Sequence, residues 1–272
     1  METKGQFPKH RFVFLTLPNY SMIALSSAVE ALRMANRVTK QDVYEWSLAS
    51  LDGNPVAASN GLTLSPTIPV DKMGPANIVF VCGGVNVEQA VTSELLSALR
   101  RLAQRHVSLG SLCTGGYALA KAGLLDKYKA VIHWENMSAL QEEFPRVIFS
   151  DQLFAIDRDR FTCTGGIAPL DLMLNIIKDH LGRDIAPMIS EQFILDRIRN
   201  DQDRQHIPLQ ARVGLFHENL IEAAALMEAN IEEPLSLDEI AALVGVSRRQ
   251  IERLFKRYVG QVPTKYYLDM RL

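Results

Sequence analysis

The sequence has few of the features that mark a secreted or membrane protein. It contains only three cysteines (Cys82, Cys113 and Cys163), and none stands in a Cys-x-x-Cys pair. Such an odd, sparse set suits a reducing compartment better than a disulfide framework. The apolar run at residues 12–17 is too short for a signal peptide, and no stretch of about 18 apolar residues occurs. We therefore expect a cytoplasmic protein with no membrane partner.

The sequence also lacks an excess of one charge. Its 29 Lys and Arg residues nearly balance 31 Asp and Glu, so any signal for nucleic acid must be local. With 47% hydrophobic and 22% charged residues, the composition is typical of a folded chain, and 272 residues are enough for two domains. No internal repeat stands out, and no motif indicates a metal site or a cofactor.

Short apolar strands alternate with helices in the first half of the chain. The predicted strands cover residues 11–17, 43–51, 76–84 and 107–113. The predicted helices cover residues 21–38, 93–106 and 114–125, with Ser93 as a candidate cap. This alternation predicts βαβ units and a mostly parallel sheet, in an α/β three-layer sandwich.

The regular alternation of strands and helices does not continue further along the chain. Residues 146–166 predict two or three strands with a turn at 157–160, and two helices follow at 167–182 and 183–199. The polar segment 200–214 contains a proline and has no periodicity, so we expect a linker there. The predicted organisation is a ligand-sensing and dimerisation domain at 1–199, the linker at 200–214, and a small all-α domain at 215–272.

The C-terminal domain carries a sharper signal. Ser236 with Glu239, and Ser247 with Gln250, form two capping boxes that mark helix starts. Gly245 stands between the two helices, where a tight turn needs a positive φ. Two short helices joined by a glycine-containing turn predict a helix-turn-helix. The expected apolar positions are Leu220, Ile221, Ala224, Met227 and Ile231, then Ile240, Ala241 and Val244, then Ile251, Leu254, Phe255 and Tyr258.

The charge of the chain changes at the same place. From Arg248 to Arg271 there are seven Lys or Arg residues and two acids, whereas residues 218–239 are acidic. A basic second helix suits insertion into the major groove, where cations displace counterions and Arg or Gln reads base edges. Basic side chains on an isolated helix more often have no role beyond contact with solvent. Here the two capping boxes, the turn glycine and the basic charge occur together, and this favours DNA binding. The predicted DNA-binding residues are Ser247, Arg248, Arg249, Gln250, Arg253 and Lys256.

The text "LSLDEIAALVGVSRRQIERLFKRYVGQVPTKYYLDMRL" resembles the AraC/XylS family of bacterial transcription regulators. In that family the DNA-binding domain carries two helix-turn-helix units bridged by a long helix. The sequence ends at "YYLDMRL", inside the stretch that corresponds to the bridging helix. We therefore expect the second unit to be missing, and half of a DNA-binding domain to bind its operator weakly.

The stretch "LGSLCTGGYALAKAGLL" places Cys113 between a strand and a Gly-Gly helix start. This arrangement resembles the class I glutamine-amidotransferase-like fold, as in PfpI-type proteins. Those hydrolases place a His directly after the Cys and an acid after the first strand, whereas this chain has Thr114 and no acid in "PNYSMIAL". A nucleophilic thiol needs such partners, so we expect no catalytic residues and no enzyme. A cysteine-dependent hydrolase or amidase with a regulatory tail is the alternative, and a regulator that responds to a partner protein or to oxidation of Cys113 is a third.

A PfpI-like domain followed by an AraC-type tail resembles the GlxA group of regulators. "LPNYSMIALSSAVEALRMANR", "SLASLDGNPVAASNGL" and "PLQARVG" are most similar to its GbdR/CdhR-type members. These respond to glycine betaine or carnitine metabolites and activate quaternary-amine catabolism. The resemblance implies a transcriptional activator that senses a quaternary amine, binds promoter or operator DNA, and forms a homodimer.

A site for such an effector can be placed on the chain. The backbone N–H groups of Cys113, Thr114 and Gly115, at a helix start, suit a carboxylate. The indole of Trp134 suits a quaternary ammonium through a cation–π interaction. Without the resemblance, Trp134 is more simply a core residue. The predicted ligand-binding residues are Cys113, Thr114, Gly115, His133, Trp134 and Tyr20, with Glu30 and Glu135 as candidate counter-charges.

Overall fold

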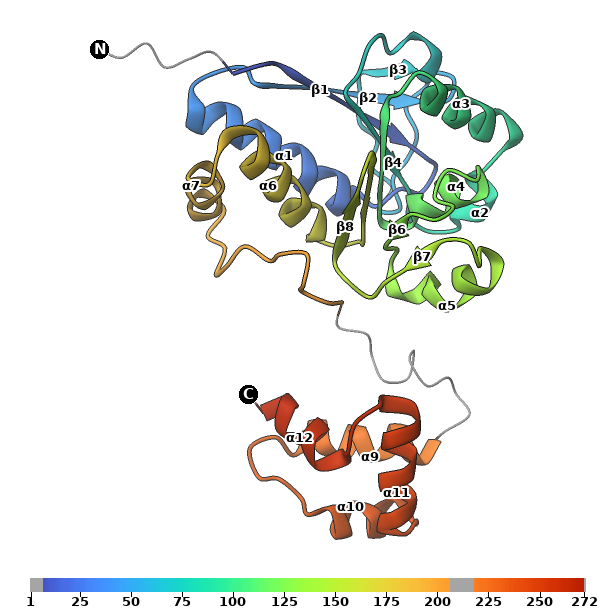
Figure 1. Ribbon diagram of the computed structural model, residues 1–272, viewed down its shortest axis with the longest axis vertical. Coiled ribbons are helices and arrows are strands. Elements are labelled where there is room, and N and C mark those ends of the chain that lie inside the picture. The colour runs from blue at the N-terminus through green and yellow to red at the C-terminus, as the bar shows by residue number, and fades with distance from the viewer. Residues whose placement is uncertain (1–6, 206–217, 272) are drawn as a thin grey trace. The chain divides into compact units, whose positions relative to one another are not determined.

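The computed structural model describes residues 7–205 and 218–271. The chain divides into two compact units, Met1–Gln205 and His206–Leu272 (Figure 1). The predicted linker therefore begins inside the first unit, since residues 200–205 belong to it, while residues 206–214 lie outside the described part of the chain. None of the described helices is long and apolar enough to cross a membrane.

The first unit is built on one sheet whose described strands run in the order β3-β2-β1-β4-β5-β9-β8. Only the β8–β9 pair is antiparallel; the other pairings in this sheet are parallel. The strands are β1 (His10–Thr16), β2 (Tyr44–Ser50), β3 (Thr67–Pro69), β4 (Ile78–Cys82), β5 (Ser108–Leu112), β8 (Phe154–Asp157) and β9 (Arg160–Cys163). Two short strands, β6 (Lys129–Ala130) and β7 (Ile148–Phe149), pair with each other.

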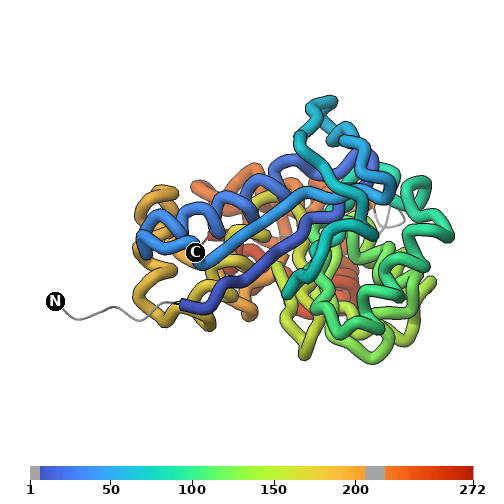
Figure 2. The backbone as a smooth tube through the Cα atoms, turned by 90° about the horizontal axis from the view of Figure 1, so that it is seen from above, coloured from blue at the N-terminus to red at the C-terminus, as the bar shows by residue number. Residues whose placement is uncertain are grey.

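Helices cover both faces of this sheet (Figures 1 and 2). One face carries α1 (Met22–Thr39), α6 (Ala168–Leu181) and α7 (Ile185–Gln192); the other carries α2 (Val87–Ala90), α3 (Ser93–Gln104), α4 (Gly116–Lys121) and α5 (Trp134–Glu143). Because successive side chains of a strand point to opposite faces, Phe12 and Phe14 of β1 enter one apolar core while Val13 and Leu15 enter the other. The predicted three-layer α/β fold is confirmed.

Two local predictions in this unit are corrected. Thr92, not Ser93, caps α3, because its Oγ1 accepts the N–H of Leu95 at 3.3 Å. The helix predicted at 183–199 ends at Gln192. Ile194 adopts a left-handed φ of 55°, and the N–H of Leu195 returns to the carbonyl of Ser190 at 3.1 Å, which closes the helix.

The second unit contains four described α-helices around a small core. They are α9 (Glu218–Ala229), α10 (Leu237–Val244), α11 (Arg248–Leu254) and α12 (Pro263–Arg271), with a π-helical turn, Phe255–Val259, after α11. Leu220, Met227, Ile240, Ile251 and Phe255 are buried in that core. The prediction for Ile231 is wrong, since its side chain is 40% exposed beyond the end of α9.

Candidate functional site

Cys113 lies at the carboxyl edge of the sheet, directly after β5. Its φ of 57° is left-handed, a strained conformation for a residue with a Cβ, and its backbone N–H donates to the carbonyl of Thr164 at 3.3 Å. Only 9% of Cys113 is exposed. The neighbouring strands β4 and β9 end at Cys82 and Cys163, so all three cysteines follow or end adjacent strands at this edge.

The two residues after Cys113 are packed closely against the loop that follows β4. The hydroxyl of Thr114 donates to the carbonyl of Gly84 at 2.7 Å. A Cβ on Gly115 would lie 2.0 Å from the carbonyl oxygen of Val81, so only glycine fits this position. Residues 113–115 form a single 3-10 turn that leads into the six-residue helix α4.

The imidazole of His133 and the thiol of Cys113 both lie beside Gly165. A Cβ on Gly165 would stand 2.9 Å from Cδ2 of His133 and 3.2 Å from Sγ of Cys113. The absence of a side chain at residue 165 therefore lets the thiol and the imidazole lie closer together than a methyl group between them would allow. The predicted ligand-binding residues do not include Gly165, although the Cys-Thr-Gly-Gly of residues 113–116 recurs at 163–166 and marks this position.

Trp134 begins α5 and continues this cluster. Its ring centroid lies 5.5 Å from that of His133, with the planes tilted by 33°, and the residue is half-buried. His133 Nδ1 is 3.7 Å from an oxygen of Glu135, which is more exposed. We name the group Cys113, Thr114, Gly115, His133, Trp134 and Gly165 the Cys113 site.

Tyr20 does not line an open surface, contrary to expectation. Only 1% of it is exposed, and its hydroxyl faces Sδ of Met22 at 4.0 Å. Its backbone bridges to Ala58 and Gly84, so Tyr20 supports the same loop that Thr114 contacts. The large apolar ring favours burial in the core beside α1, which the position after β1 alone did not reveal. Of the candidate counter-charges, Glu30 is paired with Arg33 at 2.6 Å.

The chemistry of Cys113 is not that of an activated nucleophile. Burial raises the pKa of its thiol to about 11, against a smaller lowering by the backbone N–H of Thr114 and a further raising by Glu135. A thiol with this pKa is protonated at neutral pH, whereas nucleophilic attack needs the thiolate.

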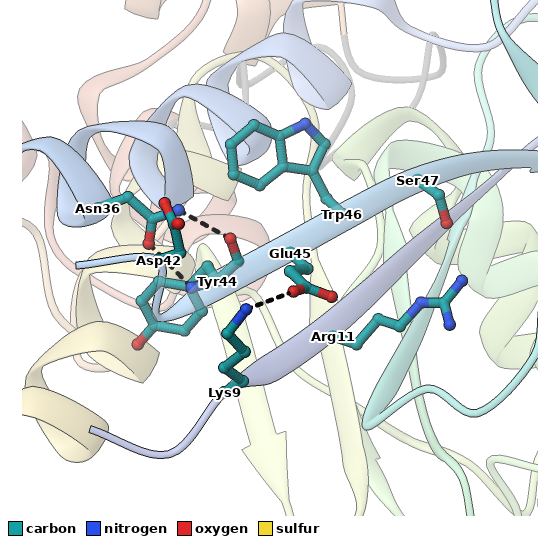
Figure 3. Close-up of a pocket in the computed structure, with 8 residues that line it drawn as sticks. All are labelled: Lys9, Arg11, Asn36, Asp42, Tyr44, Glu45, Trp46 and Ser47. Carbon is teal, nitrogen blue, oxygen red and sulfur yellow. Dashed lines mark hydrogen bonds and ion pairs between the residues drawn. The ribbon is translucent and has the colours of Figure 1, made fainter. Parts of the chain in front are cut away.

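A separate cavity lies at the opposite end of the sheet, near the amino ends of β1 and β2 (Figure 3). Its lining includes Lys9, Arg11, Glu45 and Trp46, and Lys9 forms an ion pair with Glu45 at 2.9 Å. No residue predicted for ligand or DNA binding lines this cavity.

The helix-turn-helix geometry predicted for the second unit is present. Both capping boxes form: Ser236 accepts from the N–H of Glu239 at 3.2 Å, and Ser247 accepts from that of Gln250 at 3.3 Å. Gly245 ends α10 with a φ of 74°. The side chains of Ser247 and Gln250 are therefore both engaged in the cap of α11.

The basic residues of α11 and the turn after it surround a depression on the second unit. Arg249, Arg253 and Lys256 are exposed there. Arg248 is exposed but bridges Glu252 at 3.0 Å and Asp238 at 3.1 Å. Pro263 and Thr264, at the start of α12, line the same depression and had not been predicted.

Comparisons with known proteins agree with these two units. Residues 10–179 match the model of the DJ-1/PfpI family. The chain is 50% identical over 95% of its length to the HTH-type transcriptional regulator GbdR of Pseudomonas aeruginosa, covering 71% of that protein, and 41% identical over 96% to the HTH-type transcriptional regulator CdhR, covering 77%. A crystal structure of an AraC family transcriptional regulator from Pseudomonas putida superposes with a TM-score of 0.63 at 29% identity, over 68% of this chain and 99% of that one.

Proposed function

The chain belongs to the DJ-1/PfpI family and to the HTH-type transcriptional regulators, and on that premise we propose that it binds DNA in response to a small molecule held at the Cys113 site. The observation that carries the proposal is the combination of a helix-turn-helix bearing exposed cations with a site in the other unit where Gly165 brings His133 beside Cys113 and burial raises the pKa of the Cys113 thiol. A buried thiol with a raised pKa suits ligand binding better than nucleophilic turnover.

In the second unit, α11 is the element that enters the major groove. Arg249, Arg253 and Lys256 point to solvent from it or from the turn that follows it, and they contact phosphates or base edges. Ser247 and Gln250 hold the start of α11 and approach the DNA there. Arg248 contacts DNA only by exchanging its ion pairs with Asp238 and Glu252, so its net contribution is smaller.

In the first unit, the effector is a small zwitterion with a carboxylate and a quaternary ammonium. The carboxylate accepts from the backbone N–H of Thr114, which faces the sulfur of Cys113. The ammonium lies against Trp134, a contact worth roughly 0.5–2 kcal/mol. The resemblance to GbdR/CdhR-type regulators suggests glycine betaine and carnitine, which carry a quaternary ammonium, and dimethylglycine, whose ammonium is tertiary; activation of quaternary-amine catabolism follows from it.

The protein acts as a homodimer. The effector changes its affinity for DNA by binding one of two states more tightly than the other. The exposed faces of α6 and α7 are the proposed dimer surface. Calorimetric titration of the full chain with the three amines tests the sensor role. Saturable binding of one of them supports the proposal, and no saturable heat with any of them contradicts it.

A further inference from the structure

A segment of the first unit lies across the carboxyl edge of the sheet, after α7. We name residues 199–205 the return segment. It begins at Arg199, whose Nη2 and Nε lie 2.6 and 2.9 Å from Oδ2 of Asp171, while its backbone N–H donates to Oδ1 at 2.9 Å. The Asp171 side chain is only 5% exposed, so this end is held by a largely buried ion pair in the first turn of α6.

The other end of the return segment is Gln205, the last described residue before the chain continues toward the second unit. Its backbone N–H donates to the carbonyl of Asp151 at 2.8 Å. Its side-chain Nε2 donates to the carbonyl of Ile132 at 3.0 Å and to that of Gln152 at 3.3 Å. Ile132 directly precedes His133 and Trp134, so the Gln205 amide holds the backbone that carries two residues of the Cys113 site.

A second connection runs through the backbone. The N–H of Leu153 donates to the carbonyl of Asp203 at 3.0 Å, that of Thr164 donates to Leu153 at 3.0 Å, and that of Cys113 donates to Thr164 at 3.3 Å. These three hydrogen bonds form an uninterrupted series from the return segment to Cys113. The series therefore ends at Cys113, whereas the Gln205 amide ends at the residue before His133.

Only one of the two polar atoms of the Gln205 side chain forms hydrogen bonds with the described residues. Its Oε1 is buried and has no hydrogen-bond partner, whereas its Nε2 has two. A buried acceptor without a donor is costly, so a small shift of the return segment that gave Oε1 a partner would be favourable. The Gln205 end thus keeps one buried acceptor without a partner among the described residues, although its two N–H groups are bonded.

We propose that Gln205 is a positioning residue for the Cys113 site and that the return segment couples occupation of this site to the chain leading into the second unit. The inference rests on the proposed function in placing the effector at this site. An effector that contacts Trp134 would shift the backbone at Ile132, whose carbonyl accepts the hydrogen bond from Gln205. Because coupling free energies are reciprocal, an effector that alters the Gln205 contacts has an affinity that depends on those contacts.

Hydrogen–deuterium exchange of the full chain tests this inference, with calorimetry on the same samples. Glycine betaine at saturation is expected to slow exchange of the amides of Leu153, Thr164 and Gln205 at least about fivefold. Gln205→Leu should remove that protection and weaken the binding of glycine betaine, with a fall in Tm no larger than the loss of two hydrogen bonds explains. Gln202→Leu, the same change at an exposed residue of the segment, should behave as the wild type. Binding without a change in exchange, or protection that survives in Gln205→Leu, overturns the coupling.

A ligand-free arm separates this inference from the proposed function. If no amine binds the wild type, the proposed effector binding is wrong, and the exchange measurement with glycine betaine gives no protection. The positioning role is then judged without ligand: Gln205→Leu should raise exchange over residues 130–136 at least about threefold relative to Gln202→Leu, because the Ile132 carbonyl loses its donor. Equal exchange in the two variants overturns the positioning role.

Discussion

Gly165 separates Cys113 from His133, and a Cβ there would stand 3.2 Å from the thiol and 2.9 Å from the imidazole. The turn after β5 and the start of α5 approach each other at this glycine, and a side chain at residue 165 would displace one of them. The proposed effector site depends on this close approach.

Gly165→Ala is predicted to displace the His133 ring and to weaken effector binding at least about tenfold, or about 1.4 kcal/mol. The φ of Gly165 lies outside the left-handed range, so stability should change little. Gly166→Ala is the matched control: its φ is +62° and nothing lies near its Cβ, so it should lose about 1 kcal/mol of stability without loss of affinity. Calorimetry and thermal unfolding of both variants check this, and equal affinities would contradict it.

Trp134→Ala is predicted to weaken binding of glycine betaine by about 2- to 30-fold, which corresponds to the roughly 0.5–2 kcal/mol of a cation–π contact. The other tryptophan, Trp46, lines the cavity at the amino ends of β1 and β2, so Trp46→Ala is the control that should leave affinity unchanged.

A matched ligand sharpens this prediction. In 3,3-dimethylbutyrate a neutral carbon replaces the ammonium nitrogen while the shape is kept. Wild type should prefer glycine betaine over it, and Trp134→Ala should lose the preference. An unchanged preference would show that the indole does not bind the cation.

The alkylation of Cys113 is predicted to be slow at neutral pH and to accelerate as the pH rises toward about 11. The sign follows from burial, which favours the uncharged thiol and raises its pKa, so the reactive thiolate forms only at alkaline pH. The pH dependence of iodoacetamide labelling at Cys113, followed by peptide mass spectrometry with Cys113→Ala as the blank, measures this. A rate that reaches its plateau below about pH 8 would favour the cysteine-dependent hydrolase instead.

The predicted DNA-binding residues should differ in how much each contributes to the salt dependence of the affinity for DNA. Arg253→Ala or Lys256→Ala should lower the slope of log affinity against log salt by about one, if each neutralises one phosphate. Arg248→Ala should lower it less, because Arg248 is already paired with two acids. Lys40→Ala removes the same charge from the first unit and should leave the slope unchanged. Fluorescence anisotropy with a labelled duplex measures the slope for each of the four variants. Equal slopes in all four would contradict the assignment of Arg253 and Lys256 as phosphate contacts.

Much of the fold could be predicted from the sequence because its signals are local. Apolar strands alternating with helices indicated the parallel sheet, and the pairs Ser236–Glu239 and Ser247–Gln250 form the predicted caps. Gly245 adopts the predicted positive φ. Each of these features depends on residues within one or two helical turns of one another.

The features that were missed depend on distant packing. Gly165 joins the site only when β9 lies beside β5, and Tyr20 is buried only when α1 and the loop after β4 close over it. The return segment contacts residues distant in sequence, among them the Asp171 side chain and backbone groups of residues 151–153, and no local pattern marks these contacts. A polar stretch such as 200–205 therefore resembled a free linker in sequence.

A chain that joins a small-molecule site to a DNA-binding unit should bind DNA differently when that site is occupied. The most direct measurement is the affinity of the full chain for fragments selected from its own genome, by fluorescence anisotropy with and without saturating glycine betaine. We expect at least about a fivefold change in affinity, and a smaller change in Gly165→Ala at the same concentration of glycine betaine. The same affinity in both conditions, with the amine shown to bind, would contradict this expectation.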